Sequence, residues 1–187
     1  HIYSFIKDRN ILKDFLLSSM DFSMVYVVLY QNNIVGFIGI SNNEKRTIGF
    51  ELEKFKQMFG NFLGSIIQKP LSAVMEKPAV KGDKDLYIEY LTTDRGRGIA
   101  AKLIEFVCEQ LEYDDCYIEV LSKNTTAKRL YEHLGFVEFK REYNLSTIIR
   151  GLGYLVKLKK RIEWAKSVIT VKTHYLYYLQ WVDNLIY

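Results

Sequence analysis

Hydrophobic positions early in the chain change from a helical spacing to a strand-like spacing. Asp8–Ser19 carries apolar residues on one stripe, three and four positions apart, which predicts a short helix. Two runs of β-branched and aromatic residues follow, Met24–Tyr30 and Ile34–Ile40, and the Asn-rich residues between them predict an antiparallel hairpin. Gly36 and Gly39 inside the second run indicate a bulge or a close approach of another part of the backbone.

The middle of the chain alternates between helices and strands. Glu51–Ile67 repeats apolar residues at helical spacing until Pro70 ends the pattern. Leu86–Thr93 predicts a strand, Ile99–Glu112 predicts an amphipathic helix, and Cys116–Leu121 predicts the next strand. This alternation is typical of an α/β arrangement with parallel neighbouring strands.

One more helix and strand follow before the pattern weakens. Thr125–Leu134 predicts a helix that stops at Gly135, a residue suited to a left-handed C-cap, and Phe136–Tyr143 predicts a strand. Tyr154–Lys160 is compatible with a strand or with part of a helix, and residues 161–187 show no clean period. The whole order predicts an α/β (α+β) fold with a mixed sheet, antiparallel at its start and parallel at its centre.

Composition narrows the class of protein without identifying it. The chain has 187 residues, 49% apolar and 26% charged, which is typical of one globular domain. Apolar runs are too short to span a bilayer, and the residues near His1 do not resemble a signal peptide, so we expect a cytoplasmic protein. Two cysteines do not make a disulfide framework, and three scattered histidines do not predict a metal site.

The net charge of +4 is concentrated at the end of the chain. The charged residues from position 159 onward are Lys159, Lys160, Arg161, Glu163, Lys166, Lys172 and Asp183, which together carry +3. The preceding 158 residues therefore carry only +1. Because a nucleic-acid-binding domain usually presents a strongly basic face, this distribution argues against nucleic acid as a partner.

The turn Arg95–Ala100, between a predicted strand and a predicted helix, has the features of a phosphate-binding loop. Amides at the start of a helix are unpaired and the helix dipole adds partial positive charge there. Gly96 and Gly98 allow the chain to wrap closely around an anion, and Arg95 and Arg97 add charge. A pyrophosphate suits such a site, although a glycine-rich turn that binds nothing would look the same.

Two phosphate-binding patterns match this turn. Gly96-x-Gly98-x-x-Ala101 fits the dinucleotide-binding pattern, with Glu119 near the position of a ribose-binding acid. That pattern is usually found near the start of a βαβαβ unit, whereas here a hairpin and a long helix come first. A NAD(P)-binding oxidoreductase therefore stays as an alternative only.

The second pattern extends much further. Arg95-x-x-Gly98-x-Ala100 and, after the next strand, Asn124 and the run Leu130–Phe136 resemble the two cofactor motifs of the GCN5-related N-acetyltransferase superfamily. The resemblance covers about Asp85–Tyr143. It implies a sheet with an N-terminal antiparallel hairpin, splayed parallel central strands and helices on both faces, with acetyl-coenzyme A as the cofactor.

Three features depart from the family pattern. The stretch Leu91–Arg95 is about three residues shorter than usual, and the family's first strand is missing or truncated before His1. The aromatic and basic residues 161–187 have no counterpart. We therefore predict a GNAT-like domain over 1–160 and an extension over 161–187, which could form a dimer contact or cover the edge of the sheet.

The resemblance also assigns the cofactor site. The residues expected to bind acetyl-CoA are Leu91, Thr92, Thr93, Arg95, Gly96, Arg97, Gly98, Ile99, Ala100, Asn124, Lys128 and Tyr131. The main chain of Leu91–Thr93 would pair with the pantetheine arm and polarise the thioester carbonyl. Asn124 could instead cap the helix that follows it. Lys128, like Lys102 and Arg129, could meet the 3′-phosphate or belong to a solvated helix face.

Two residues are predicted to be catalytic. Tyr131 would lie near the departing sulfur and donate its phenolic proton, unless it only packs against the sheet. Glu89 is the carboxylate embedded in the Leu86–Thr93 strand, where it would act as a base through water or be an ordinary strand glutamate paired with a lysine or facing solvent. Glu119 has the same ambiguity, and His133 is expected to be exposed.

Together these features predict an N-acetyltransferase that transfers an acetyl group from acetyl-CoA to a primary amine of a small molecule or peptide, by direct attack in a ternary complex. The helix Glu51–Ile67 and the loop to Asp85 are the expected acceptor side. A non-catalytic acyl-CoA sensor is the main alternative. A homodimer is a further expectation.

Overall fold

The computed structural model describes residues 9–49, 53, 56–57, 60–62, 64–65, 79–94, 96–149 and 151–162. The helices and strands are α1 (Arg9–Ser19), the 3-10 helix η2 (Phe22–Met24), β1 (Val25–Tyr30), β2 (Asn33–Ser41), β3 (Asp85–Thr93), α3 (Ile99–Gln110), β4 (Asp115–Leu121), α4 (Thr125–His133), β5 (Val137–Glu142), α5 (Leu145–Ile149) and β6 (Leu155–Arg161). Most of the predicted helix Glu51–Ile67, Arg95, and residues 163–187 lie outside the described residues.

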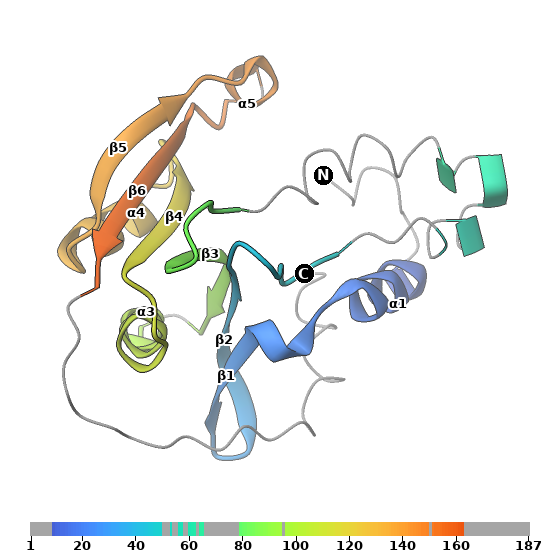
Figure 1. Cartoon of the computed structure of the whole chain (residues 1–187), viewed down its shortest axis with the longest axis horizontal. Coiled ribbons are helices and arrows are strands. Elements are labelled where there is room, and N and C mark those ends of the chain that lie inside the picture. Colours follow the sequence, from blue (N-terminus) through green and yellow to red (C-terminus); the bar gives the residue numbers. More distant parts are fainter. Residues whose placement is uncertain are drawn as a thin grey trace.

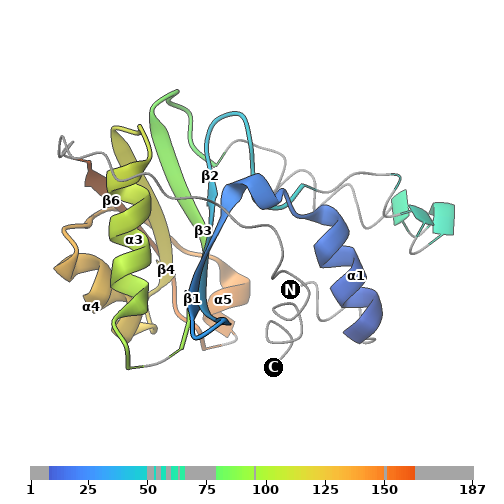
Figure 2. The same cartoon turned by 90° about the horizontal axis from the view of Figure 1, so that it is seen from below.

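The strands form one mixed sheet, with the order β1-β2-β3-β4-β6-β5 (Figure 1). β3 and β4 pair in parallel, and the other neighbours are antiparallel. Helices α3 and α4 cover one face, while α1 lies on the other side against the β1–β2 end (Figure 2). The predicted fold class, with its antiparallel hairpin, parallel centre and helices on both faces, is confirmed.

The N-terminal hairpin shows why its glycines occur where they do. Gln31 and Asn32 form the turn with φ angles of 50° and 61°, and Asn33 already belongs to β2. A Cβ on Gly36 would lie 2.8 Å from the Ile99 side chain, so Gly36 lets α3 approach β2 closely. At Gly39 the register with β3 shifts. The close approach at Gly36 is thus made by side chains, and the bulge beside Gly39 has its extra residue in β3.

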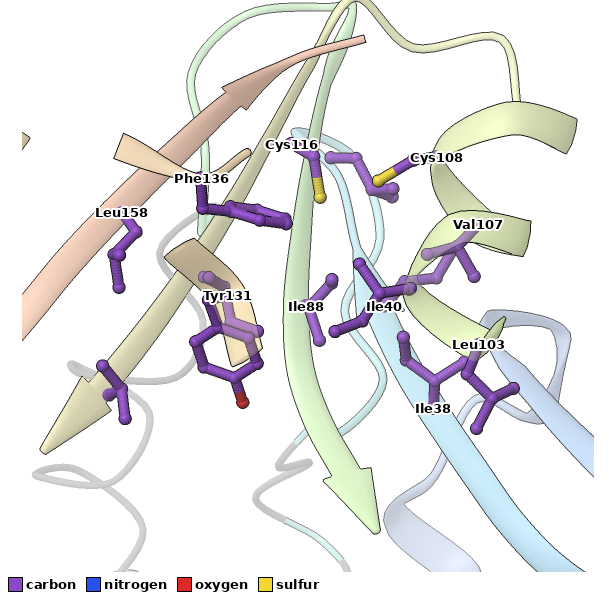
Figure 3. Packing of buried hydrophobic residues seen from close by; sticks show 14 of the residues in the cluster. Ile38, Ile40, Ile88, Leu103, Val107, Cys108, Cys116, Tyr131, Phe136 and Leu158 are labelled. Carbon is purple, nitrogen blue, oxygen red and sulfur yellow. The ribbon is translucent and has the colours of Figure 1, made fainter. Parts of the chain in front are cut away.

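The core lies between the sheet and the α3–α4 layer. Leu103, Ile104 and Val107 of α3 pack on Leu86 and Ile88 of β3. Cys108 and Cys116 are free thiols buried in the same cluster (Figure 3). No helix in the described part of the chain combines the length and apolar character needed to cross a membrane.

Helix α4 ends at the predicted glycine. Gly135 has a φ of 87°, and its N–H donates to the carbonyl of Glu132 at 3.0 Å. The N–H of Phe136 donates to the carbonyl of Tyr131, also at 3.0 Å. These two bonds are the Schellman pattern, which satisfies the last carbonyls of a helix. The C-cap prediction is confirmed, and the cap fixes the end of the helix that carries Tyr131.

The ambiguous segment Tyr154–Lys160 is a strand. In β6, Val156 and Leu158 are fully buried while Lys157 and Lys159 face the other side of the sheet. The alternation of apolar and lysine residues is the period of two expected of a strand. β6 lies between β4 and β5, which makes the preceding strand, β5, the edge of the sheet. The order of the segments along the chain did not predict that β6 would lie inside the sheet and β5 at its edge.

Candidate active site

The two parallel strands separate part-way along their length. Their pairing covers four residue pairs, from Asp85–Asp115 to Ile88–Ile118. Beyond this point β3 stays paired with β2 as far as Thr93, and β4 stays paired with β6 as far as Leu121. Figure 3 shows the two strands running apart below Cys116. We call the region between Glu89–Thr93 and Glu119–Leu121 the divergence. Main-chain groups of β3 that face it are not used for pairing with β4.

A bulge in β3 lies at the start of the divergence. Ile88 pairs with Ile40 and Tyr90 pairs with Gly39, so Glu89 is an extra residue without a partner in β2. A bulge reverses the faces of the residues that follow it. As a result, Tyr90 packs in the cluster beneath α1, while Leu91 packs against the core on the α3 face. The bulge therefore re-aims the stretch Leu91–Thr93 that the sequence assigned to the cofactor.

The N-terminus of α3 is open. Gly98 is its N-cap in the left-handed conformation, with no side-chain cap and no acidic residue in the first turn. Gly96 also has a positive φ, of 81°, and a Cβ added at either glycine would meet nothing within 4 Å. Uncapped amides at the positive end of a helix dipole bind anions. Ile99, only 7% exposed, anchors this end of the helix in the core.

Most of the residues predicted to bind acetyl-CoA, those of Leu91–Thr93 and of Gly96–Ala100, form a path along β3 and the start of α3. Leu91–Thr93 run along the divergence, and the glycine turn leads from there to Ile99 and Ala100 in the first turn of α3. The guanidinium of Arg97 lies over the ring of Tyr30 in the hairpin, 4.9 Å from its centroid. Arg95 lies outside the described residues. The path places anion-binding amides at one end and strand backbone at the other, which suits a long ligand with a pyrophosphate.

Tyr131 projects from α4 into the divergence (Figure 3). Its side chain is buried, with the ring centroid 6.1 Å from that of Phe136, and burial raises the pKa of its hydroxyl. The hydroxyl therefore stays protonated at neutral pH. It makes no hydrogen bond to another described residue. The tyrosine both packs in the core and directs its hydroxyl to the divergence, so the two interpretations of this residue are compatible.

Two predicted cofactor residues have structural partners at the start of α4. Asn124 is the N-cap, and its Oδ1 accepts from the Ala127 N–H at 3.2 Å. Lys128 Nζ lies 3.0 Å from a carboxylate oxygen of Glu138 in β5 and 3.8 Å from one of Glu132. The hydrogen bond to Glu138 raises the pKa of Lys128. Asn124 is exposed, so capping leaves its amide nitrogen accessible, whereas Lys128 is occupied by ion pairs.

Glu89, the predicted base, is paired with an arginine. Its carboxylate binds Arg46, whose Nε lies 2.5 Å from Oε1, and the Glu89 side chain is 3% exposed. The other oxygen, Oε2, is buried without a hydrogen-bond partner among the described residues. The structure thus gives the ion-paired interpretation, with an arginine in place of the lysine. Arg46 was missed because it lies in a polar turn that sequence alone does not connect to β3.

Glu119 lies across the divergence and belongs to a different network. Its Oε1 is 2.8 Å from Nζ of Lys157, and its negative charge acts on the hydroxyl of Tyr87. Burial, reinforced by Glu119, raises the pKa of Tyr87 well above its usual value. The exposed positions of His133, Lys102 and Arg129 agree with the expectation of solvated helix faces.

The comparisons with known proteins decide between the two phosphate-binding patterns. The family model described as Acetyltransferase (GNAT) family matches residues 3–136. The chain belongs to this family. The resemblance seen in the sequence is therefore confirmed, and the family is one of acetyltransferases. The family match therefore favours the acetyltransferase pattern over the dinucleotide-binding pattern.

Two relatives illustrate how far the similarity extends. N-alpha-acetyltransferase 30 of Saccharomyces cerevisiae is 36% identical over 55 residues, which span 28% of this chain and 31% of that protein. The crystal structure of an N-acetyltransferase from Staphylococcus aureus is 20% identical, with a TM-score of 0.54 over 81% of this chain and 79% of that one. The chain thus matches about a third of the curated relative, and the structural similarity supports the fold alone.

Proposed function

We propose that this protein transfers the acetyl group of acetyl-CoA to a primary amine of a small molecule or peptide, by direct attack in a ternary complex. The observation that carries the proposal is the combination, in one path, of the β3 bulge, the open N-terminus of α3 and the hydroxyl of Tyr131. Each of the three supplies a different requirement of thioester aminolysis.

Binding comes first. The amides of Gly96–Ala100 would hold the pyrophosphate, and the main chain of Leu91–Thr93 would pair with the pantetheine arm. A main-chain N–H aimed at the thioester carbonyl stabilises the oxyanion of the tetrahedral intermediate. Because these contacts come from the backbone, their geometry depends on the bulge at Glu89 and on the left-handed glycines.

The chemical step then needs two proton movements. The neutral amine attacks the carbonyl carbon and forms the C–N bond, and the attacking nitrogen gives up a proton to water or to a nearby carboxylate. The C–S bond breaks as the intermediate collapses, and the leaving thiolate takes the proton of the Tyr131 hydroxyl. Tyr131 is regenerated from solvent. Glu89 in β3 and Glu119 in β4 lie on the two sides of the divergence, and their role as bases stays a prediction.

The first test is calorimetric titration of the full chain with acetyl-CoA, with NADH as the control ligand. We expect acetyl-CoA to bind and NADH not to bind. The variant Gly98→Val introduces a β-branched residue at φ +65° and should weaken acetyl-CoA binding at least about tenfold, because it disturbs the amides of the first turn. Gly151→Val is the matched control, at φ +72° in the β5–β6 connection.

Several results would change the proposal. Equal losses of affinity in both glycine variants would show that strain alone, and not the position of the amides, determines binding. NADH binding would restore the dinucleotide alternative. Acetyl-CoA binding without release of free thiol in the presence of any amine would favour the non-catalytic sensor.

The remaining predictions concern regions that the structure describes only in part. The sheet continues through Arg161, and Ile162 is buried with its N–H donating to the carbonyl of Asp114. The division into a domain over 1–160 and an extension over 161–187 stays a prediction. We retain a cytoplasmic location and a homodimer as proposals. Sedimentation of the full chain and of a chain ending at Ile162 tests whether the extension supports a dimer.

A further inference from the structure

The face of the sheet opposite α3 and α4 contains a pocket of about 300 Å³. Tyr87, Tyr117, Glu119, Phe139 and Lys157 line it, together with residues 79–81 of the segment before β3. Tyr117 and Glu119 alternate along β4 with Cys116, Ile118 and Val120, whose side chains belong to the core beneath α3 and α4. Because side chains alternate between faces, the pocket is separated from the cofactor path by the thickness of the sheet.

The pocket reaches the divergence at Glu119. This residue directly follows Ile118, the last residue of β4 that is paired with β3. A molecule in the pocket therefore has one end at the point where the sheet opens. An amine at that end could meet a thioester that approaches from the α3–α4 face.

The charges in and around the pocket are largely neutralised by one another. Lys157 Nζ lies 2.8 Å from Glu119 and 3.1 Å from Glu142, and Lys140 Nζ lies 2.8 Å from Glu142. The lining also presents the aromatic surface of Phe139 and of Tyr117, whose ring has Lys159 Nζ 5.1 Å from its centroid. The two rings contact edge to face, with centroids 5.8 Å apart.

Phe139 is placed there by a second bulge. Glu138 pairs with Leu158 and Lys140 pairs with Lys157, so Phe139 is an extra residue in the edge strand β5. It stays 53% exposed although it is a large apolar side chain beside a pocket. Bulges near functional sites re-aim side chains, and exposed apolar surface in a concave site marks ligand contact.

From this arrangement we propose that the acceptor is an amine that carries an aromatic ring, and that the ring packs against Tyr117 and Phe139 while the amine reaches the divergence beside Glu119. The inference rests on the proposed acetyl transfer and adds the chemical class of the acceptor. The same chemistry occurs in a free arylalkylamine and in a peptide whose first residue is aromatic.

The test compares acceptors with and without the ring. Acetylation is followed by free-thiol release with benzylamine, 2-phenylethylamine and 4-phenylbutylamine, each against the alkylamine of the same chain length without the ring. Phe-Ala-Ala against Ala-Ala-Ala forms the peptide arm. We expect at least one ring-bearing acceptor to exceed its matched partner in kcat/KM by about tenfold or more, from burial of the ring. A preference among the free amines identifies the acceptor as an arylalkylamine, and a preference among the tripeptides identifies it as a peptide with an aromatic first residue.

Two variants locate the effect. Phe139→Ser should reduce the ratio between ring-bearing and ring-free acceptors toward one, while acetyl-CoA affinity stays unchanged. Val137→Ser is the matched control, because it changes another exposed apolar residue of β5, 68% exposed, outside this pocket. It should leave the ratio unchanged.

The outcomes separate this inference from the proposed function. Turnover of ring-free amines equal to that of ring-bearing amines overturns the inference and leaves acetyl transfer intact. A preference for the ring that survives Phe139→Ser equally overturns it. If the protein binds acetyl-CoA but acetylates none of these amines, binding of 2-phenylethylamine to the CoA-loaded protein is measured by NMR, and absence of binding overturns the inference. Failure to bind acetyl-CoA at all contradicts the proposed function first.

Discussion

The two faces of the central sheet meet at the divergence, yet they offer ligands different kinds of chemical group. On the α3–α4 face the groups include main-chain amides of Leu91–Thr93 and Gly96–Ala100 and the hydroxyl of Tyr131. On the opposite face they are side chains from separate strands and from the turn after β2, joined in ion pairs such as Arg46–Glu89 and Glu119–Lys157. The first set is nearly continuous in sequence, and the second is assembled only by folding.

The difference teaches that the two faces constrain a ligand in different ways. A cradle of amides recognises a charge and a length, which suits a cofactor shared by a whole family. Side chains recognise a shape and can be changed one at a time, which suits an acceptor that differs between relatives. The comparison predicts that substitutions on the face opposite α3 and α4 act by removing the partner of a charged side chain. Substitutions in the main-chain cradle of the α3–α4 face act by changing the positions of the amides.

The largest effect is expected from separating the buried ion pair. Arg46→Met leaves the carboxylate of Glu89, 3% exposed, without its cation, and should lower the free energy of unfolding by about 3 kcal/mol. Urea denaturation measures the change. The double variant Arg46→Met with Glu89→Leu should recover most of it, since no buried charge is left. A loss in the double variant as large as in the single one would show that packing, and not charge, maintains this part of the face.

The next effect concerns the hydroxyl at the divergence. Tyr131→Phe should lower kcat by about 100-fold and leave acetyl-CoA affinity unchanged, because it removes a proton donor and keeps the ring. Steady-state kinetics and calorimetry measure the two quantities. Tyr26→Phe is the control, since Tyr26 is another half-buried tyrosine on the α3 face, packed against Phe106. An unchanged kcat in Tyr131→Phe would assign this residue to packing alone.

The smallest effect is a dependence of stability on alkaline pH. Burial, with Glu89 nearby, raises the pKa of Tyr90 to about 12. Between pH 10 and 12 the unfolded chain therefore loses this proton while the folded chain keeps it, so stability falls as pH rises, by at most about 1.4 kcal/mol per pH unit for one tyrosine. Tyr90→Phe should make the decline shallower between pH 9.5 and 11 in urea denaturation. Identical slopes in the two proteins would contradict this account.

Sequence could identify the residues that act through the conformation of their own main chain. Gly135 was predicted because a left-handed C-cap favours glycine, and Gly98 because a glycine lets the chain wrap closely around an anion. Both have a positive φ. The hairpin and the strands β3 and β4 were predicted because their apolar residues recur at strand spacing. Asn124 shows the limit of this approach, since both of its roles were foreseen and only the structure shows that it caps α4.

Contacts between distant segments escaped prediction for a physical reason. Arg46 and Glu89 are separated by the predicted helix Glu51–Ile67 and its following loop, and no periodic pattern links a charged turn to a strand. Lys128 was expected to face a phosphate, but its neighbour Glu138 comes from β5, which packs beside α4 only after the sheet forms. The position of β6 between β4 and β5 likewise was not predictable, because it depends on which of the two strands buries every second side chain against the core.

By itself the sequence determined most of the elements and the resemblance to the family, because both depend on local spacing and on the conformational freedom of single glycines. The cofactor loop stays a prediction. The tertiary structure alone decided where the strands separate, which residues bulge and which charges pair. Those features depend on register between strands that are far apart in the chain, and register is selected by the burial of whole faces and not by any local run of residues.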